Sequence, residues 1–220
     1  MKKSIFLSFI LCLCLVACIP QQTMAQKQSR MEKLLRYLND NDADKWQKNR
    51  EKLDDETKAY YAEDLSLMDV LNDLWNVQSE QAATLYFGCY EKAAQNNFPS
   101  ICEGEKIPLS QIRDKADQSI INLLEASKDK IPFSRALLDS IHATEYPVDS
   151  AMLQRLQNIR EVALLEGMLK APTPIIYQTY VKEYPNGKFI AQVNASENVR
   201  LYQLVKTTPT PENFKAFFED

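Results

Sequence analysis

Four acidic side chains near the N-terminus stand at spacings that suit a calcium ion. They take the first, third, fifth and twelfth positions of a calcium-binding loop: Asp40, Asp42, Asp44 and Glu51. Such a loop also needs glycine at its sixth position to make a sharp turn, and this chain carries Lys45 there. The spacing therefore predicts an acidic loop that caps a helix, with carboxylates accepting backbone N–H groups, and no metal site.

The side chains that could act in acid–base catalysis lack partners in the sequence. His142 is the only histidine, and its helical neighbours Leu138 and Ile141 predict a half-buried face. No second histidine, serine-nucleophile motif or phosphate loop accompanies it. Glu63 and Asp64 are adjacent, so on a helix they point in different directions and do not form the paired carboxylates of a glycosidase. The sequence thus predicts no enzyme and no cofactor.

The N-terminus has the pattern of an export signal. Two lysines follow the first methionine, and residues 5–19 form an uncharged, mostly apolar run that is too short to span a bilayer. The segment 23–25 resembles a signal-peptidase site, which predicts a signal peptide of residues 1–25. The segment 15–18 resembles the lipobox of bacterial lipoproteins, which predicts a signal of residues 1–17 and a lipidated Cys18. Both alternatives predict a periplasmic protein, soluble or tethered to the envelope membrane.

Two cysteines remain beyond this leader, Cys89 and Cys102. An exported chain meets oxidising conditions, and the break at residues 96–99 would let the chain turn back, so we expect a disulfide. Closing so short a loop would contribute roughly 3 kcal/mol. The alternative is a pair of buried thiols, and no Cys-x-x-Cys redox motif is present.

The composition narrows the classes of partner. The chain has 220 residues, with 26 basic against 30 acidic side chains and a net charge of −4, and the basic residues form no stripe. Nucleic acid and anionic lipid are therefore poor partners. Only 4 glycines are present, and many tight hairpins would need more, so the composition predicts helices.

Apolar residues recur at helical spacing through most of the chain, as in Met31, Leu34, Leu35 and Leu38. This periodicity predicts an all-α fold, an antiparallel helical array with short connections. The segment 98–108 has no such pattern and is predicted to be a loop. It divides an N-terminal helical region, 26–97, from a second helical region, 109–220.

The tripeptide Pro-Thr-Pro occurs twice in the second region, at 172–174 and 209–211, an offset of 37 residues. Aromatic residues follow at matching positions in both copies, and the preceding helices align at the same offset. The first proline prevents the previous helix from continuing, and the last suits the first position of a new helix. The sequence therefore predicts that Thr173 and Thr210 are helix N-caps, whose hydroxyls accept backbone N–H groups.

A helix pair repeating at this length resembles the tetratricopeptide and related helical-repeat families, over about residues 151–220. It is similar to exported bacterial versions in which an aromatic-rich helix ends in a motif such as the Tyr-Pro-Asn-Gly at 184–187. The period of 37 residues is longer than the usual ~34 of that family. The resemblance implies an α-solenoid in the C-terminal half, an extended curved surface and a role in binding proteins.

The last helix of the sequence carries Phe214, Phe217 and Phe218. We expect it to dock on the preceding helix through these residues and to leave part of the aromatic face open as a surface for an unknown protein partner or a second copy. The chain is thus predicted to be a non-catalytic binding or assembly scaffold of the bacterial cell envelope. The alternative is a periplasmic all-α glycan-binding component or enzyme, with Trp46, Trp75 and tyrosines lining a groove.

Overall fold

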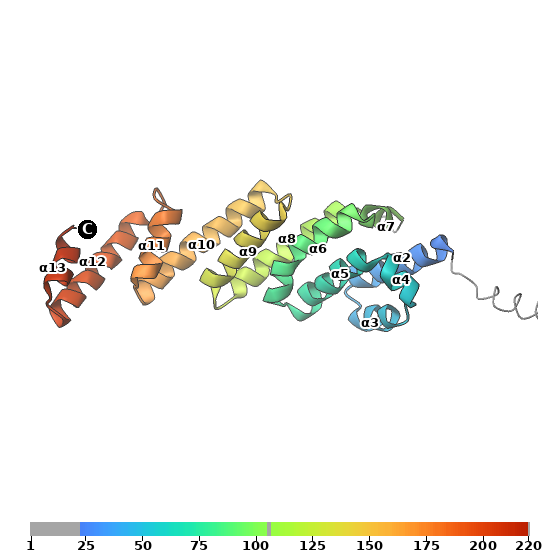
Figure 1. Ribbon diagram of the computed structural model, residues 1–220, viewed down its shortest axis with the longest axis horizontal. Helices are drawn as coiled ribbons and strands as arrows, with labels where there is room; N and C mark the ends of the chain where they lie inside the picture. Colours follow the sequence, from blue (N-terminus) through green and yellow to red (C-terminus); the bar gives the residue numbers. More distant parts are fainter. Residues whose placement is uncertain (1–22, 105–106, 220) are drawn as a thin grey trace, which may run out of the picture.

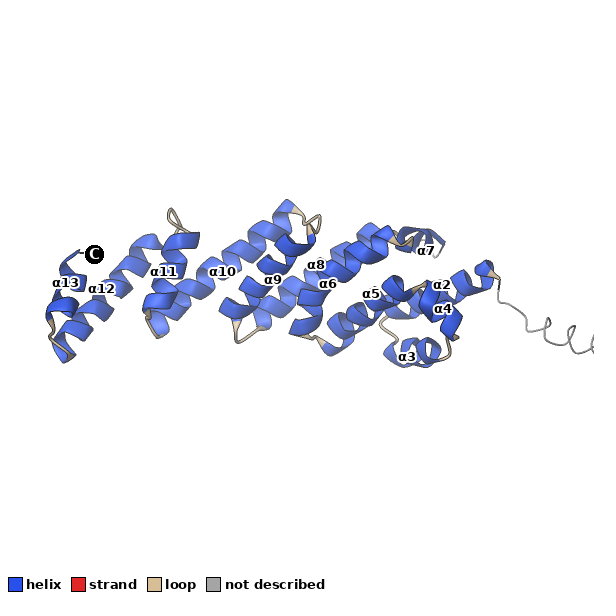
Figure 2. Ribbon diagram, in the orientation of Figure 1, coloured by secondary structure: helices blue, strands red, loops and turns tan. Residues whose placement is uncertain are grey.

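The computed structural model describes residues 23–104 and 107–219, and these residues are helical almost throughout (Figures 1 and 2). The predicted all-α class is confirmed for this part of the chain, which contains no strand. Cys18 and the predicted leader up to residue 22 lie outside the described residues. No helix of the described ranges is long and apolar enough to cross a membrane.

The helices α8 to α13 follow one another along the long axis of the molecule, and α7 lies with α2 and α4 at the opposite end from α13 (Figure 1). The bounds of the elements are α2 (Met24–Asn39), α3 (Ala43–Glu51), α4 (Asp55–Tyr60), α5 (Ala62–Asn72), the π-helical η1 (Asp73–Val77), α6 (Glu80–Gln95), α7 (Phe98–Gly104), α8 (Leu109–Ala126), α9 (Lys130–Thr144), α10 (Ser150–Lys170), α11 (Pro174–Glu183), α12 (Ile190–Thr207) and α13 (Pro211–Glu219).

Short polar side chains set several helix starts. Asp42 caps α3, because its carboxylate accepts the backbone N–H of Lys45 at 3.1 Å and the Lys45 ammonium at 2.6 Å. This confirms that the acidic loop caps a helix. Ser79 caps α6 by accepting the N–H of Ala82 at 3.2 Å. These bonds satisfy donors that the first helical turn leaves open.

The segment that the sequence predicts as a loop, 98–108, contains the helix α7. Its side chains Phe98, Ile101 and Cys102 are buried, and α7 packs against α2 and α6. The prediction was wrong because this segment is too short to show a helical periodicity in its sequence. Its apolar residues are buried through contacts with other helices, α2 and α6. One hydrophobic core consequently runs from Met31 to Leu156, across the boundary expected at 98–108.

A second, smaller cluster of buried side chains begins farther along α10. It consists of Leu164, Leu165, Met168, Tyr180 and Val193. The helix α10 is 21 residues long and contributes to both clusters, with its N-terminal part in the first and its C-terminal part in the second. Beyond α10, the helices α11, α12 and α13 pack mainly on their near neighbours.

The expected disulfide is not formed: within the described residues, Cys89 and Cys102 are separate thiols. Cys102 is buried on α7, near Tyr90. Cys89 is half-buried on α6, near Glu63 and Asp69 of α5, and burial raises the pKa of its thiol. Successive residues point in different directions on a helix, so Tyr90 and Cys89 face different neighbours. Because α7 packs beside Tyr90, it does not bring Cys102 to Cys89.

Candidate functional site

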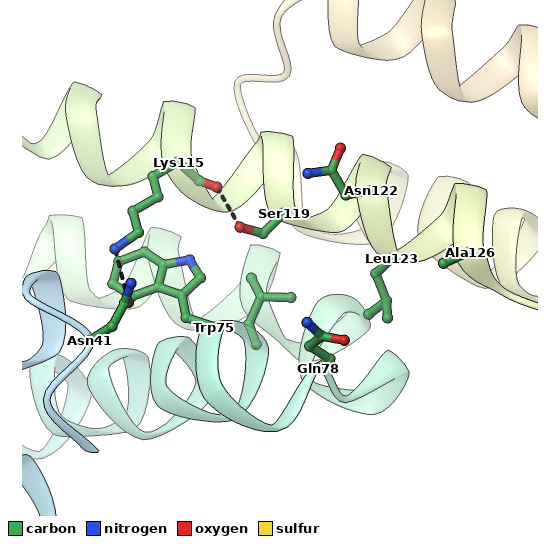
Figure 3. Close-up of a pocket in the computed structure, with 9 residues that line it drawn as sticks. Asn41, Trp75, Gln78, Lys115, Ser119, Asn122, Leu123 and Ala126 are labelled. Atoms are coloured by element: carbon green, nitrogen blue, oxygen red, sulfur yellow. Dashed lines mark hydrogen bonds between the residues drawn. The ribbon is translucent and has the colours of Figure 1, made fainter. Parts of the chain in front are cut away.

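A cavity between η1 and α8 combines a cation, an indole ring and several amides (Figure 3). The segment η1 is a π-helix, a wide turn that is rare and is often found at functional sites. It ends at Val77, and the next residue, Gln78, has a left-handed φ of 58°. The extra residue per turn places Trp75 on the side of η1 that faces Lys115 of α8 (Figure 3).

Lys115 is the central charge of this cavity. Its ammonium lies 3.9 Å from the centre of the Trp75 ring and donates to the backbone carbonyl of Asn39 at 3.1 Å and to Oδ1 of Asn41 at 3.2 Å. Burial lowers the pKa of Lys115, while the charge of Asp40 opposes that shift. The cation–π contact and the two acceptors therefore hold a partly desolvated cation in one position.

The cavity has a volume of about 390 Å³, near the lower end of the range for small-molecule sites. It is lined by the side chains Asn41, Leu74, Trp75, Gln78, Lys115, Ser119, Asn122, Leu123 and Ala126. The indole Nε1–H of Trp75 is shielded from solvent and has no acceptor. Such an unpaired buried donor costs free energy and asks for an explanation.

A larger cavity, about 690 Å³, is an open groove between α9, α10 and the end of α11. Its apolar floor consists of Leu138, Ile141, Tyr146, Val148, Leu153 and Tyr184. Its rim carries charges of both signs, from Arg135, Asp139, Glu145 and Glu183, and also the side chain of His142. His142 is exposed at this rim, which corrects the half-buried face expected from its neighbours.

A buried ion pair fixes one side of the groove. Arg160 of α10 is 2% exposed and makes two bonds to the Glu183 carboxylate, at 2.6 and 2.9 Å. It also donates to the carbonyl of Ile131 at 2.8 Å. Hydrogen bonding from Arg160 lowers the pKa of Glu183, and Arg135 adds to the shift. Glu183 is therefore an ionised anchor that ties α11 to α9 and α10.

The next residue of α10, Glu161, holds the turn between α11 and α12. It accepts the Tyr180 hydroxyl at 2.8 Å and the backbone N–H of Lys188 at 2.7 Å. A Cβ on Gly187 would lie 2.5 Å from both Glu161 Oε1 and the Tyr180 hydroxyl. Glycine is thus required here for space, and not for the left-handed turn that the Tyr-Pro-Asn-Gly motif suggests, because its φ is not positive.

A second buried polar group lies inside the main core. The Tyr146 hydroxyl donates to Asp117 at 2.8 Å and lies 3.2 Å from the Tyr86 hydroxyl. Burial raises the pKa of Asp117 to about 6 and raises the pKa of both tyrosines. Asp64 of α5 is fully buried, neither of its oxygens bonds to another residue, and burial raises its pKa to about 7. No nucleophile or second acid lies in hydrogen-bond contact with Asp64.

Both Pro-Thr-Pro junctions have the predicted caps. Thr173 accepts the N–H of Ile176 at 3.3 Å, and Thr210 accepts the N–H of Asn213 at 3.2 Å. The residues that end the preceding helices also share one backbone conformation, with φ −151° and ψ 79° at Ala171 and φ −140° and ψ 77° at Thr208. The repeat offset of 37 residues therefore holds in the geometry of the junction.

The aromatic residues of α13 are only partly covered. Phe217 stacks against Tyr202 of α12, with ring centres 6.2 Å apart, and against Phe218. Phe214 is 43% and Phe218 77% exposed. The helix thus docks on α12 mainly through Phe217, while the other two rings face outward.

The described residues contain no group of three or more histidine, cysteine, aspartate or glutamate side chains placed to hold a metal ion. Sequence reasoning missed the Lys115 cavity, because its residues come from three segments far apart in the chain. The one local signal, Trp75 beside an apolar stripe, is equally typical of a core. No protein-family model, curated protein or solved structure matches the chain.

Proposed function

We propose that this chain is an exported, non-catalytic helical-repeat protein that binds another protein in the bacterial cell envelope. The observation that carries the proposal is the open groove of about 690 Å³ across α9, α10 and α11. Its apolar floor and charged rim are typical of a surface that receives a polypeptide segment.

The charges on the rim favour a particular occupant. Arg135 pairs with Asp139 and Glu183, and Glu183 also pairs with the buried Arg160, so these charges are largely compensated. Glu145 is exposed at the rim and has no ion pair among the described residues. We therefore propose an extended segment of a partner protein, with apolar side chains on the floor and a basic side chain opposite Glu145.

The repeat supports the same proposal. The two Pro-Thr-Pro junctions have nearly the same backbone geometry, and each joins a long helix to a shorter aromatic helix. Stacked helix pairs of this kind form extended surfaces on which partners lie, as in the tetratricopeptide-like proteins that the sequence resembles. The glycan-binding alternative is weaker at Trp75, because Lys115 covers a face of the ring on which a sugar would stack.

A photo-crosslinking amino acid placed at Leu153, on the groove floor, tests the proposal in the native envelope. We expect it to capture a partner segment that mass spectrometry maps to an extended, apolar stretch with a basic residue. A crosslinker at Lys48, exposed on α3, is the control and should not capture that segment.

A synthetic peptide of the captured segment then gives the decisive measurement. Glu145→Lys should weaken its binding about tenfold, since it reverses the rim charge. Crosslinks only to a second copy of the chain, or a peptide that binds the wild type and Glu145→Lys equally, would contradict the proposal.

The proposed export to the cell envelope has its own test. Fractionation should find the protein in the envelope, either starting at Gln26 by intact mass or released from the membrane by Cys18→Ala. Unprocessed chain in the cytoplasm would refute export and leave the groove experiment unaffected.

A further inference from the structure

The Lys115 cavity is unusual in its charge. The chain carries 30 acidic residues, yet none of the nine residues that line this cavity is acidic. Asp40, whose charge acts on Lys115, is not among the lining residues. The lining instead presents hydrogen-bond donors together with the apolar side chains of Leu74, Leu123 and Ala126.

Three of the polar side chains at the cavity have donors that their bonds leave unused, whereas the Ser119 hydroxyl donates to the backbone carbonyl of Lys115 at 2.8 Å. Asn41 accepts from Lys115 through Oδ1, so its NH₂ group remains, and Asn122 accepts from Gln118 through Oδ1 at 2.6 Å, which leaves its NH₂ group likewise. Lys115 has three N–H donors and uses two of them. The Nε1–H of Trp75 also has no acceptor, but it is shielded from solvent and is not open to the cavity.

A purely structural role explains only part of this arrangement. Lys115 caps the C-terminus of α2 through the Asn39 carbonyl, where a cation is favourable. That role requires neither a cavity beside the ammonium nor the unused donors of Asn41 and Asn122. Both are accounted for if an acceptor enters from outside.

We propose that this cavity binds a small carboxylate with a short apolar chain. The carboxylate lies against the Lys115 ammonium, where charge-assisted bonds are strongest, and takes a donor from the Asn41 amide. The apolar chain lies against Leu74 and Leu123. The site is separate from the groove at α9–α11, and it holds or fails independently of the proposed function.

The ligand can be a free small acid or the carboxylate end of a peptide. Isovalerate represents the first source and N-acetyl-leucine the second. Their neutral amides, isovaleramide and N-acetyl-leucinamide, have nearly the same shape and lack the charge.

The test follows the two indole N–H signals of the ¹⁵N-labelled full chain by NMR during titration. Trp75→Phe identifies the Trp75 signal by removing it, and keeps an aromatic face for Lys115. We expect the Trp75 signal to shift and saturate with one or both acids, at a Kd on the order of 1 mM. The matched amide should bind at least about tenfold more weakly. Stronger binding of N-acetyl-leucine than of isovalerate assigns the site to peptide ends, and the reverse assigns it to free acids.

Lys115→Met should reduce acid binding at least about tenfold, while Lys115→Arg, which keeps the charge, should retain most of it. Circular dichroism of both variants checks the fold. If Lys115→Met unfolds the chain, the acid–amide comparison on the wild type still decides. Equal shifts with acid and amide, or no Trp75 shift up to about 50 mM of either acid, would overturn the proposal.

Discussion

The part of the chain from Met31 to Leu156 and the part from Leu164 onward are made of similar helices, yet they bury their side chains differently. The first shares one core of 32 buried residues among α2 to α10. The second has a cluster of only five buried apolar residues, and polar contacts also join its helices: the bonds of Glu183 with Arg160 and of Tyr180 with Glu161. In the first part, the stability of each helix therefore depends on the core that all of them form. In the second part it depends on contacts with neighbouring helices, as in repeat proteins.

The largest effect is expected in the shared core. Phe87 is fully buried and stacks on Tyr146, with ring centres 4.9 Å apart. Phe87→Ala should lower the free energy of unfolding by about 3–5 kcal/mol, because it removes buried surface and leaves a cavity. Chemical denaturation measures this loss. Leu85→Ala on the same helix is the control, since Leu85 is 51% exposed and should change stability by less than about 0.5 kcal/mol.

In the second part, a polar change should have the strongest effect. Glu183→Ala leaves the buried guanidinium of Arg160 without its carboxylate and should cost about 3 kcal/mol. Hydrogen exchange should show α11 and α12 opening, while α5 and α6 keep their protection. Asp139→Ala removes only an exposed partner of Arg135 and should cost less than about 1 kcal/mol. If Glu183→Ala loosens α5 and α6 equally, the distinction between shared and local stability is wrong.

The pH dependence should have opposite signs in the two parts. Burial raises the pKa of Asp64 to about 7 and that of Asp117 to about 6, so the folded state holds their protons more tightly than the unfolded chain. The first part should therefore become more stable as the pH falls from about 7 towards 4, the usual range of an unfolded aspartate. Asp64 alone should contribute about 2 kcal/mol between pH 7 and 5. Asp64→Asn should flatten that slope in a melting series.

Glu183 has the opposite sign. Its pKa is lowered by Arg160, so its stabilisation is complete above about pH 4.5, the range of an unfolded glutamate, and is lost as the pH falls through the lowered folded pKa. Acid should thus open α11 and α12 while the first part still gains from protonation of Asp64. Hydrogen exchange at pH 6, 4.5 and about 3 distinguishes the two responses. Simultaneous opening of both parts at every pH would contradict the comparison.

The smallest effects concern the two capping threonines. Thr173→Ala should cost about 1 kcal/mol, because it removes the acceptor of the Ile176 N–H, and Thr173→Ser should be nearly neutral. Thr210→Ala should cost less, about 0.5 kcal/mol, since α13 packs mainly on α12. Thermal melts of the four single variants, including Thr210→Ser, measure these differences. Large and equal losses from Ala and Ser at Thr173 would show that packing of its methyl group, and not capping, is the cause.

The features that the sequence predicted correctly depend on neighbouring residues. The caps at Asp42, Thr173 and Thr210 each bond to a residue three positions on, so their residue types and spacing suffice. The all-α class likewise follows from a periodicity that repeats within each helix.

The features that were missed depend on distant residues. Lys115 meets Asn41 and Asn39 across 74 and 76 positions, and no local pattern indicates that contact. The loop expected at 98–108 became α7 because α2 and α6 supply its apolar partners. The expected Cys89–Cys102 disulfide failed for the same reason, as the packing of α7 determines where Cys102 lies.

The polar layer of Arg160 and Glu161 in the middle of α10 has a mechanical consequence. It lies between the two hydrophobic clusters, where the large core that many helices form together ends. A pulling force on the C-terminal end would first separate α13 from α12, and then α12 from α10 and α11. Only a small interface would resist each step. The short bonds of Arg160 to Glu183 would be the last to yield before the load reaches the shared core. The molecule would thus lengthen in steps from its C-terminal end, while the helices of the shared core stay folded.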